Sequence, residues 1–115
     1  MIPDAIKYFF NESDIESEIV EGNVERVIYT GEKIQVIIYH FPPGKVFPVH
    51  KHDRHEQMGL LYKGKMGFMV AHEERILNPG DFYRAPIGVE HNAWTFDEPS
   101  ILIDFFSPIR EDLVK

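Results

Sequence analysis

Cysteine is absent from the 115 residues of the chain. Without it the chain can form no disulfide framework, no thiolate nucleophile and no thiolate metal site. Any chemistry must therefore rest on histidine, carboxylate and amide groups. The sequence also lacks an apolar window long enough to span a membrane, and its N-terminus lacks the basic start and apolar stretch of a secretory signal. We therefore expect a cytoplasmic protein that binds no membrane.

Positive charge is scarce as well. Only 12 Lys and Arg stand against 19 Asp and Glu, which gives a formal net charge of −7. The basic residues form no run, so the clustered charge that a nucleic-acid surface needs is missing. What is present is the composition of an ordered globular chain, because 43% of the residues are hydrophobic. Small soluble molecules, and not nucleic acids, are the expected partners.

The chain contains many short segments that are rich in β-branched and aromatic residues, which favour strands. Residues 23–29 and 34–39 predict a hairpin, because Thr30-Gly31-Glu32-Lys33 separates them as a turn and Pro42-Pro43-Gly44 ends the second strand. The remaining strands are expected at residues 58–62, 66–70, 74–77, 82–85, 92–96 and 101–106.

About eight short strands with regular turns indicate an all-β sandwich or barrel, the jelly roll included. The length fits a single domain over residues 1–115. Residues 1–20 are expected to form an N-terminal arm, with a possible short helix around residues 4–10, and the barrel is expected over about residues 23–107. Three aromatic residues are interpreted as core or cavity wall: Phe82, Tyr83 and Trp94.

Histidine provides the first functional signal. His50 and His52 are two residues apart, so both side chains leave the same face of the chain if residues 46–53 are extended. Two neutral imidazoles can then share one metal ion, with further ligands arriving from elsewhere in the chain. The alternative interpretation is two exposed polar residues in a loop.

The surroundings of this pair resemble the two conserved motifs of the cupin family. The first comprises Gly44, His50-Lys51-His52, Glu56-Gln57 and Gly64, and the second comprises Gly80, Pro86-Ile87-Gly88 and His91. The resemblance implies a cupin (RmlC-like) jelly-roll β-barrel that holds one divalent metal ion, with His91 as a third imidazole ligand. Thr95 stands where the second motif usually has Asn, at a position that is not usually a ligand.

The fourth ligand is either Glu56 or Gln57. Cupins usually supply a Glu three or four residues after the second histidine, and neighbours on a strand point to opposite faces. Residues 58–62 are apolar on both faces, so periodicity leaves the choice open. The run His-x-His-x-x-His-Glu-Gln resembles a cupin subgroup in which Gln is the ligand, and this selects Gln57. Four neutral ligands would leave the full charge on the ion, which makes it a strong Lewis acid.

The second functional signal is Asp104, a carboxylate inside the apolar run 101–106. On an extended strand Leu102, Asp104 and Phe106 share one face. A buried carboxylate is costly unless it is paired or hydrogen-bonded, and in a site its pKa tends to rise into a range useful for proton transfer. The alternative is a structural role, either an ion pair with Arg110 or a backbone contact near the barrel rim.

Residues 104–112 also resemble the C-terminal motif of the cupins that linearise unsaturated uronates in pectin and alginate degradation. In that group an Asp, the Phe two residues later and the Arg six residues later lie near the metal, which implies corresponding roles for Asp104, Phe106 and Arg110. The resemblance implies that Asp104 shuttles protons, that Arg110 grips the substrate carboxylate and that Phe106 packs on the sugar ring. The same motif also occurs in small cupins of no known activity.

The implied partner is a small anionic sugar-like substrate, a 4,5-unsaturated uronate or a related sugar acid. Zinc or nickel is favoured because the ring opening involves no redox change, although the same ligands accept iron, manganese or cobalt. Two other functions stay open: an iron-dependent dioxygenase and a non-catalytic cupin that binds a small ligand. The resemblance further implies a homodimer, to which Tyr8, Phe9 and Phe10 could contribute.

Overall fold

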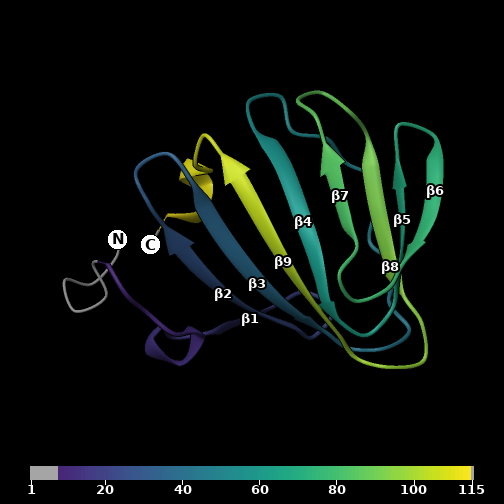
Figure 1. The fold of residues 1–115 in the computed structure, drawn as a ribbon, viewed down its shortest axis with the longest axis horizontal. Coiled ribbons are helices and arrows are strands. Elements are labelled where there is room, and N and C mark those ends of the chain that lie inside the picture. The colour runs from purple at the N-terminus through teal and green to yellow at the C-terminus, as the bar shows by residue number, and fades with distance from the viewer. Residues whose placement is uncertain (1–7, 115) are drawn as a thin grey trace.

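The computed structural model describes residues 8–114, and within them nearly all regular structure is β-strand (Figure 1). The elements follow in the order η2 (Glu12–Asp14), β1 (Glu18–Val20), β2 (Val24–Thr30), β3 (Gln35–Phe41), β4 (Glu56–Lys63), β5 (Met66–Val70), β6 (Glu73–Leu77), β7 (Phe82–Ala85), β8 (His91–Thr95), β9 (Ser100–Ser107) and η3 (Glu111–Leu113). Most of the helix considered around residues 4–10 lies outside the described part of the chain. No helix in that part is long and apolar enough to cross a membrane.

The strands form two sheets. The larger has six strands in the order β1-β2-β3-β9-β4-β7, and the smaller has three in the order β6-β5-β8. The last strand, β9, lies between β3 and β4 and is antiparallel to both, as the yellow strand in Figure 1 shows. The two-sheet arrangement agrees with the predicted jelly roll. It also places the C-terminal strand in the middle of the larger sheet.

Two segments differ from their sequence-based interpretation. Residues 18–20, expected within the N-terminal arm, form the short strand β1 and pair with β2. Residues 46–53 form no strand, and their ladder contacts are isolated bridges from Val46 to Trp94 and from His50 to His91. Pro48 removes one backbone donor from this segment, and most of its side chains are exposed, so a continuous strand is not supported there.

The core lies between the sheets. Its largest cluster of buried residues includes Leu61 and Tyr83 from the larger sheet and Met66 and Phe68 from the smaller one. A second cluster joins Ile37, Phe106 and Leu113, so the C-terminal turn η3 packs under the end of β9. Along β9 the buried residues alternate as predicted from its sequence, and this turns the side chains of Leu102, Asp104 and Phe106 to the interior.

Candidate metal centre

Three histidines meet at one end of the barrel interior. One ligand nitrogen from each of His50, His52 and His91 lies within 4.8 Å of the other two. Backbone hydrogen bonds bring two of these residues together. His50 N donates to His91 O at 3.0 Å, and His91 N donates to His50 O at 2.9 Å. The Gly88 N–H donates to the His52 carbonyl at 2.8 Å, which ties the first histidine loop to the turn before β8.

Hydrogen bonds orient two of the three rings. The Nδ1 atom of His50 lies 3.0 Å from the Pro48 carbonyl, and that of His91 lies 2.9 Å from the Val89 carbonyl. A carbonyl oxygen can only accept, so both Nδ1 atoms carry the proton and each Nε2 keeps a free lone pair. Burial lowers the pKa of His91, and burial together with Arg110 and the other histidines lowers that of His52 to about 4. Both rings are therefore neutral near pH 7, the form that binds metals.

Gln57 joins the histidines, and Glu56 does not. Gln57 is buried, and its Oε1 lies 3.2 Å from His91 Nε2. Glu56 points to the other face of β4, where its carboxylate accepts from Arg84 at 2.9 Å. Alternation along the strand produces this difference, as expected for neighbouring residues. The geometry thus separates the two candidates that the sequence left open, although metal binding by Gln57 stays a prediction.

The contact between His91 and Gln57 is one that a cation would stabilise. Both N–H groups of the Gln57 amide are directed elsewhere, to Tyr83 and Asp104, so Oε1 is the atom that faces His91. A neutral His91 that donates from Nδ1 presents only a lone pair at Nε2. Two lone pairs that face each other at 3.2 Å are stabilised by a positive charge shared between them. Three imidazoles and an amide oxygen are a donor set that divalent transition metals accept.

Asp104 is buried directly behind Gln57. Its side chain is 3% exposed, and it accepts a hydrogen bond from the Tyr83 hydroxyl at 2.6 Å and another from Gln57 Nε2 at 3.0 Å. Burial raises the pKa of Asp104 to about 7, against the lowering effect of both hydrogen bonds and of Arg110. Near neutral pH the carboxyl therefore exists in both protonation states, as a group that takes up and releases protons requires.

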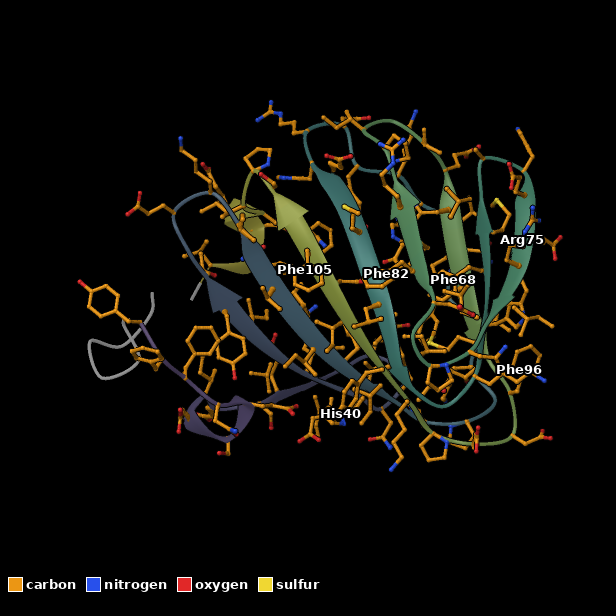
Figure 2. The ribbon with its side chains drawn as sticks, viewed as in Figure 1. His40, Phe68, Arg75, Phe82, Phe96 and Phe105 are labelled. Atoms are coloured by element: carbon orange, nitrogen blue, oxygen red, sulfur yellow. The ribbon has the colours of Figure 1, made fainter. Side chains whose placement is uncertain are left out.

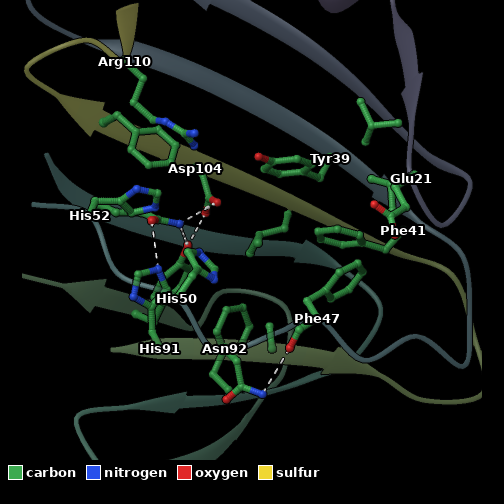
Figure 3. A pocket seen from close by; sticks show the side chains of 18 residues that line it. Glu21, Tyr39, Phe41, Phe47, His50, His52, His91, Asn92, Asp104 and Arg110 are labelled. Carbon is green, nitrogen blue, oxygen red and sulfur yellow. Dashed lines mark hydrogen bonds between the residues drawn. The ribbon is translucent and has the colours of Figure 1, made fainter. Parts of the chain in front are cut away.

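Arg110 does not neutralise Asp104 through a direct ion pair, which was the structural alternative considered from the sequence. Its Nη2 instead donates to Asp112 Oδ2 at 2.9 Å. The guanidinium also lies over the Phe106 ring, with Cζ 5.2 Å from the ring centroid. Arg110, Phe106 and Asp104 nonetheless line the same cavity as the histidines (Figure 3).

This cavity has a volume of about 200 Å³ and two unlike ends. The candidate metal ligands gather at one end with Asp104 and Arg110, whereas Phe41, Phe47 and other apolar side chains line the opposite end together with Glu21 (Figure 3). All seven side chains singled out from the sequence border it: His50, His52, Gln57, His91, Asp104, Phe106 and Arg110. The arrangement can hold one small molecule with its polar groups against the histidines.

Two residues of this region were not assigned a role from the sequence. Tyr83 was expected in the core or cavity wall, and it does line the cavity, but its hydroxyl also bonds to both Gln57 and Asp104. Gln35 is fully buried and holds the backbone of Arg110: it accepts from Arg110 N at 3.1 Å and donates to Arg110 O at 3.4 Å. No local pattern marks either residue, because the partners that connect them to the site, Asp104 and Arg110, lie 21 and 75 positions away.

Comparison with known proteins provides independent evidence. The cupin domain family matches residues 37–106, which include every candidate ligand. A pectin degradation protein of Dickeya dadantii, KdgF, is 32% identical over 108 residues, which cover 94% of this chain and 98% of that protein.

Two solved structures are also similar to this chain. The structure of KdgF from a Halomonas species superposes with a TM-score of 0.86 at 32% identity and covers 92% of this chain and 97% of its own. An RmlC-like cupin from Shewanella frigidimarina superposes with a TM-score of 0.85 at 30% identity and covers 93% of this chain and 96% of its own. The likeness therefore extends over the whole fold and not only over the histidine motifs.

Proposed function

Because the chain belongs to the cupin family, we propose that it is a metal-dependent enzyme that opens the ring of a 4,5-unsaturated uronate and releases the linear 5-keto product. One observation carries the proposal. A carboxyl group with a pKa near neutrality, Asp104, and a cation, Arg110, line the same cavity as three histidines that can hold a metal ion. The similarity to a pectin degradation protein supports a uronate as the substrate.

The residues fit zinc or nickel held by His50, His52, Gln57 and His91, which would supply Lewis acidity to a substrate oxygen. Both ions suit a reaction without redox change. Neutral ligands preserve the charge of the ion, and the buried position of Gln57 and His91 keeps water away from that side of the site. We place the substrate in the space between this cluster and Arg110.

Asp104 would move the proton. As a carboxylate it takes the proton of the hydroxyl on the hemiacetal carbon, the bond from that carbon to the ring oxygen breaks, and its electron pair stays on the ring oxygen. The resulting enolate becomes a ketone when Asp104 returns the proton to the carbon at position 4. The reaction is an isomerisation, because one proton is removed and one is added. A pKa of about 7 lets the same group act in both directions.

Arg110 and Phe106 would position the substrate. The guanidinium carries two parallel donors, which match a carboxylate, and it must share them between the substrate and Asp112. Phe106 presents its ring beside His52 at a centroid distance of 5.5 Å, so a sugar that reaches the metal ligands also contacts this ring. These contacts fix the orientation of the ligand, and proton transfer depends on that orientation.

The test is turnover of a 4,5-unsaturated galacturonate by metal-free protein and by protein reloaded with zinc or nickel. Loss of the ultraviolet absorbance of the conjugated double bond measures the rate, and nuclear magnetic resonance identifies the product. We expect acceleration that depends on metal and falls strongly in Asp104→Asn. A rate equal to the spontaneous reaction with metal present contradicts the proposal. Binding of the uronate without turnover indicates a ligand-binding cupin instead.

A further inference from the structure

Gln57, Tyr83 and Asp104 form a closed ring of hydrogen bonds across three neighbouring strands. Gln57 Nε2 donates to the Tyr83 hydroxyl at 2.6 Å and to Asp104 Oδ2 at 3.0 Å, and the Tyr83 hydroxyl donates to Asp104 Oδ1 at 2.6 Å. The three side chains come from β4, β7 and β9, and all are buried. When Asp104 is ionised, every proton in the ring therefore has a partner.

A glycine makes this ring possible. Gly59 on β4 pairs with Tyr83 on one side and with Asp104 on the other. Residues two strands apart are separated by roughly 10 Å along the hydrogen-bonding direction, so their side chains must reach over the middle strand to meet. A Cβ atom at Gly59 would lie 2.1 Å from Tyr83 Cε1 and 2.4 Å from Asp104 Oδ1. Only a residue without a side chain leaves room for the Tyr83–Asp104 hydrogen bond.

The ring decides which end of the Gln57 amide faces the histidines. An amide has nearly the same shape in both orientations, and its hydrogen-bond partners select one of them. Here both N–H groups are bound by Tyr83 and Asp104, and Oε1 is left to face His91 at 3.2 Å. The opposite orientation would aim N–H groups at a metal ion and place the carbonyl oxygen against the Asp104 carboxylate, which accepts only when ionised.

We propose that Tyr83 is a positioning residue, which acts through Gln57 to hold the amide oxygen toward the metal ion. The inference rests on the metal site of the proposed function and extends it to a residue that carries no ligand atom. Packing is a separate role of the same side chain, because the Tyr83 ring stacks on Phe68 at a centroid distance of 4.4 Å. Tyr83→Phe keeps this ring and removes the hydroxyl alone.

A double-mutant cycle on zinc affinity tests the inference without any enzymatic readout. The proteins are wild type, Tyr83→Phe, Gln57→Ala and the double variant, each titrated with zinc against a chromophoric chelator. Loss of a group that orients a metal ligand typically weakens metal binding by about 10- to 100-fold. We expect a loss of that size from Tyr83→Phe in the wild-type background and less than about twofold in the Gln57→Ala background, where no amide remains to be oriented.

Tyr39→Phe is the matched control. Tyr39 is a second tyrosine of the same cavity, but its ring stacks on Phe41 and its hydroxyl interacts with Arg26, so its removal should leave zinc affinity unchanged. Circular dichroism and thermal unfolding verify that each variant folds.

The possible outcomes separate the inference from the proposed function. If Tyr83→Phe binds zinc as tightly as the wild type, or weakens binding equally in both backgrounds, Tyr83 does not act through Gln57 and the inference is overturned. If the wild-type protein itself binds no zinc or nickel, the metal site fails, and the positioning role fails with it.

Discussion

At the scale of single residues, Asp104 links the stability of the protein to pH. Its pKa is about 7 in the folded chain, well above the ordinary value of 3.8, because burial disfavours the charged form. The folded state therefore holds this proton more tightly than the unfolded state. Between about pH 4 and pH 7 the Asp104 contribution to stability falls as pH rises, and above pH 7 it is lost.

We predict that Asp104→Asn removes this part of the pH dependence in metal-free protein. Each unit of pKa difference corresponds to about 1.4 kcal/mol. Relative to the variant, the wild type should lose roughly 2 to 3 kcal/mol of unfolding free energy between pH 5 and pH 8. Urea denaturation at several pH values measures both proteins, and contributions of the other groups cancel in the difference. Parallel pH profiles would show that Asp104 titrates as an ordinary carboxyl.

His91 allows a direct test of the metal centre. It is the most buried of the three histidines, and it contacts both the His50 backbone and the Gln57 amide. His91→Ala should reduce zinc affinity by more than the roughly 100-fold upper range for loss of an orienting group, because a ligand itself is lost. Elemental analysis after dialysis measures the retained metal.

His72→Asn is the control for this substitution. His72 is exposed in the turn between β5 and β6 and has a positive φ of 73°, a conformation that Asn tolerates. The control should retain as much metal as the wild type. Equal metal content in His91→Ala and His72→Asn would exclude His91 as a ligand.

At the scale of secondary-structure elements, Gln35 connects the start of β3 to the segment after β9. Its amide hydrogen-bonds with the backbone N–H and the carbonyl of Arg110 and also donates to the Thr30 hydroxyl at 3.1 Å. The backbone from which the Arg110 side chain extends is therefore held by a fully buried group. Loss of these hydrogen bonds should affect the position of the Arg110 guanidinium more than the rate of the chemical step.

We predict that Gln35→Ala destabilises the fold by about 1 to 3 kcal/mol, because the Arg110 N–H loses its partner. For uronate turnover we expect KM to rise and kcat to change little, since the contact of Arg110 with the substrate carboxylate is present in both the ground state and the transition state. Steady-state kinetics and urea denaturation measure the two effects. An equal loss in kcat and kcat/KM would instead assign Arg110 to the transition state.

Ser100→Ala provides the comparison. Ser100 is also buried, and its hydroxyl makes two hydrogen bonds with the backbone of Lys65 at the opposite end of β9 from Phe106. Its loss should destabilise the fold to a similar extent and leave KM unchanged. A rise in KM for both variants would mean that general loosening of the barrel, and not Arg110 placement, controls substrate binding.

The strands also show what the sequence could and could not predict. The spacing of Leu102, Asp104 and Phe106 was sufficient to place them on one face of β9, because that face is chosen by local alternation. The same logic failed to separate Glu56 from Gln57. The residues that follow on the outer face of β4 include Met58 and Leu60, which are as apolar as a core strand, so no contrast marks the inner face.

The features that the sequence could not predict depend on strand pairing between distant parts of the chain. The role of Tyr83 depends on a register that sets it beside Gly59 and within reach of Asp104, 21 positions along the chain. No short stretch of the sequence indicates that register. His50 and His52 came together with His91 although their segment is not a strand, because two backbone bonds to His91 replace the expected ladder.

At the scale of the whole molecule, the outer face of the larger sheet is unusually apolar. Phe82 is 61% exposed, although from the sequence it was expected in the core or cavity wall, and Phe105 is exposed on the same sheet (Figure 2). Met58, which pairs with Phe105, is exposed as well. Half-buried Leu60 and Ile103 continue the same face. Contiguous apolar patches on soluble monomers are generally small, and larger ones mark interaction sites.

We propose a second copy of the chain as the partner for this face, and the homodimer that the sequence resemblance implies stays a prediction. Two molecules that each carry a net charge of −7 repel each other, so they can approach closely only where charge is low. On this face Glu56 and Arg84 neutralise one another. Of the aromatic residues considered for the interface, Phe10 stacks on Tyr29 of its own chain, whereas Tyr8 and Phe9 are 79% and 89% exposed.

We predict a dimer of twice 13.4 kDa that dissociates in Phe105→Lys, because the substitution places a charge in the middle of the apolar face. Light scattering coupled to gel filtration measures the mass. Ile76→Lys is the control, since Ile76 is an equally apolar residue, 54% exposed, on β6 of the other sheet. We expect the control to stay dimeric. A wild-type mass of one chain, or dissociation of both variants alike, would show that copies do not meet through the larger sheet.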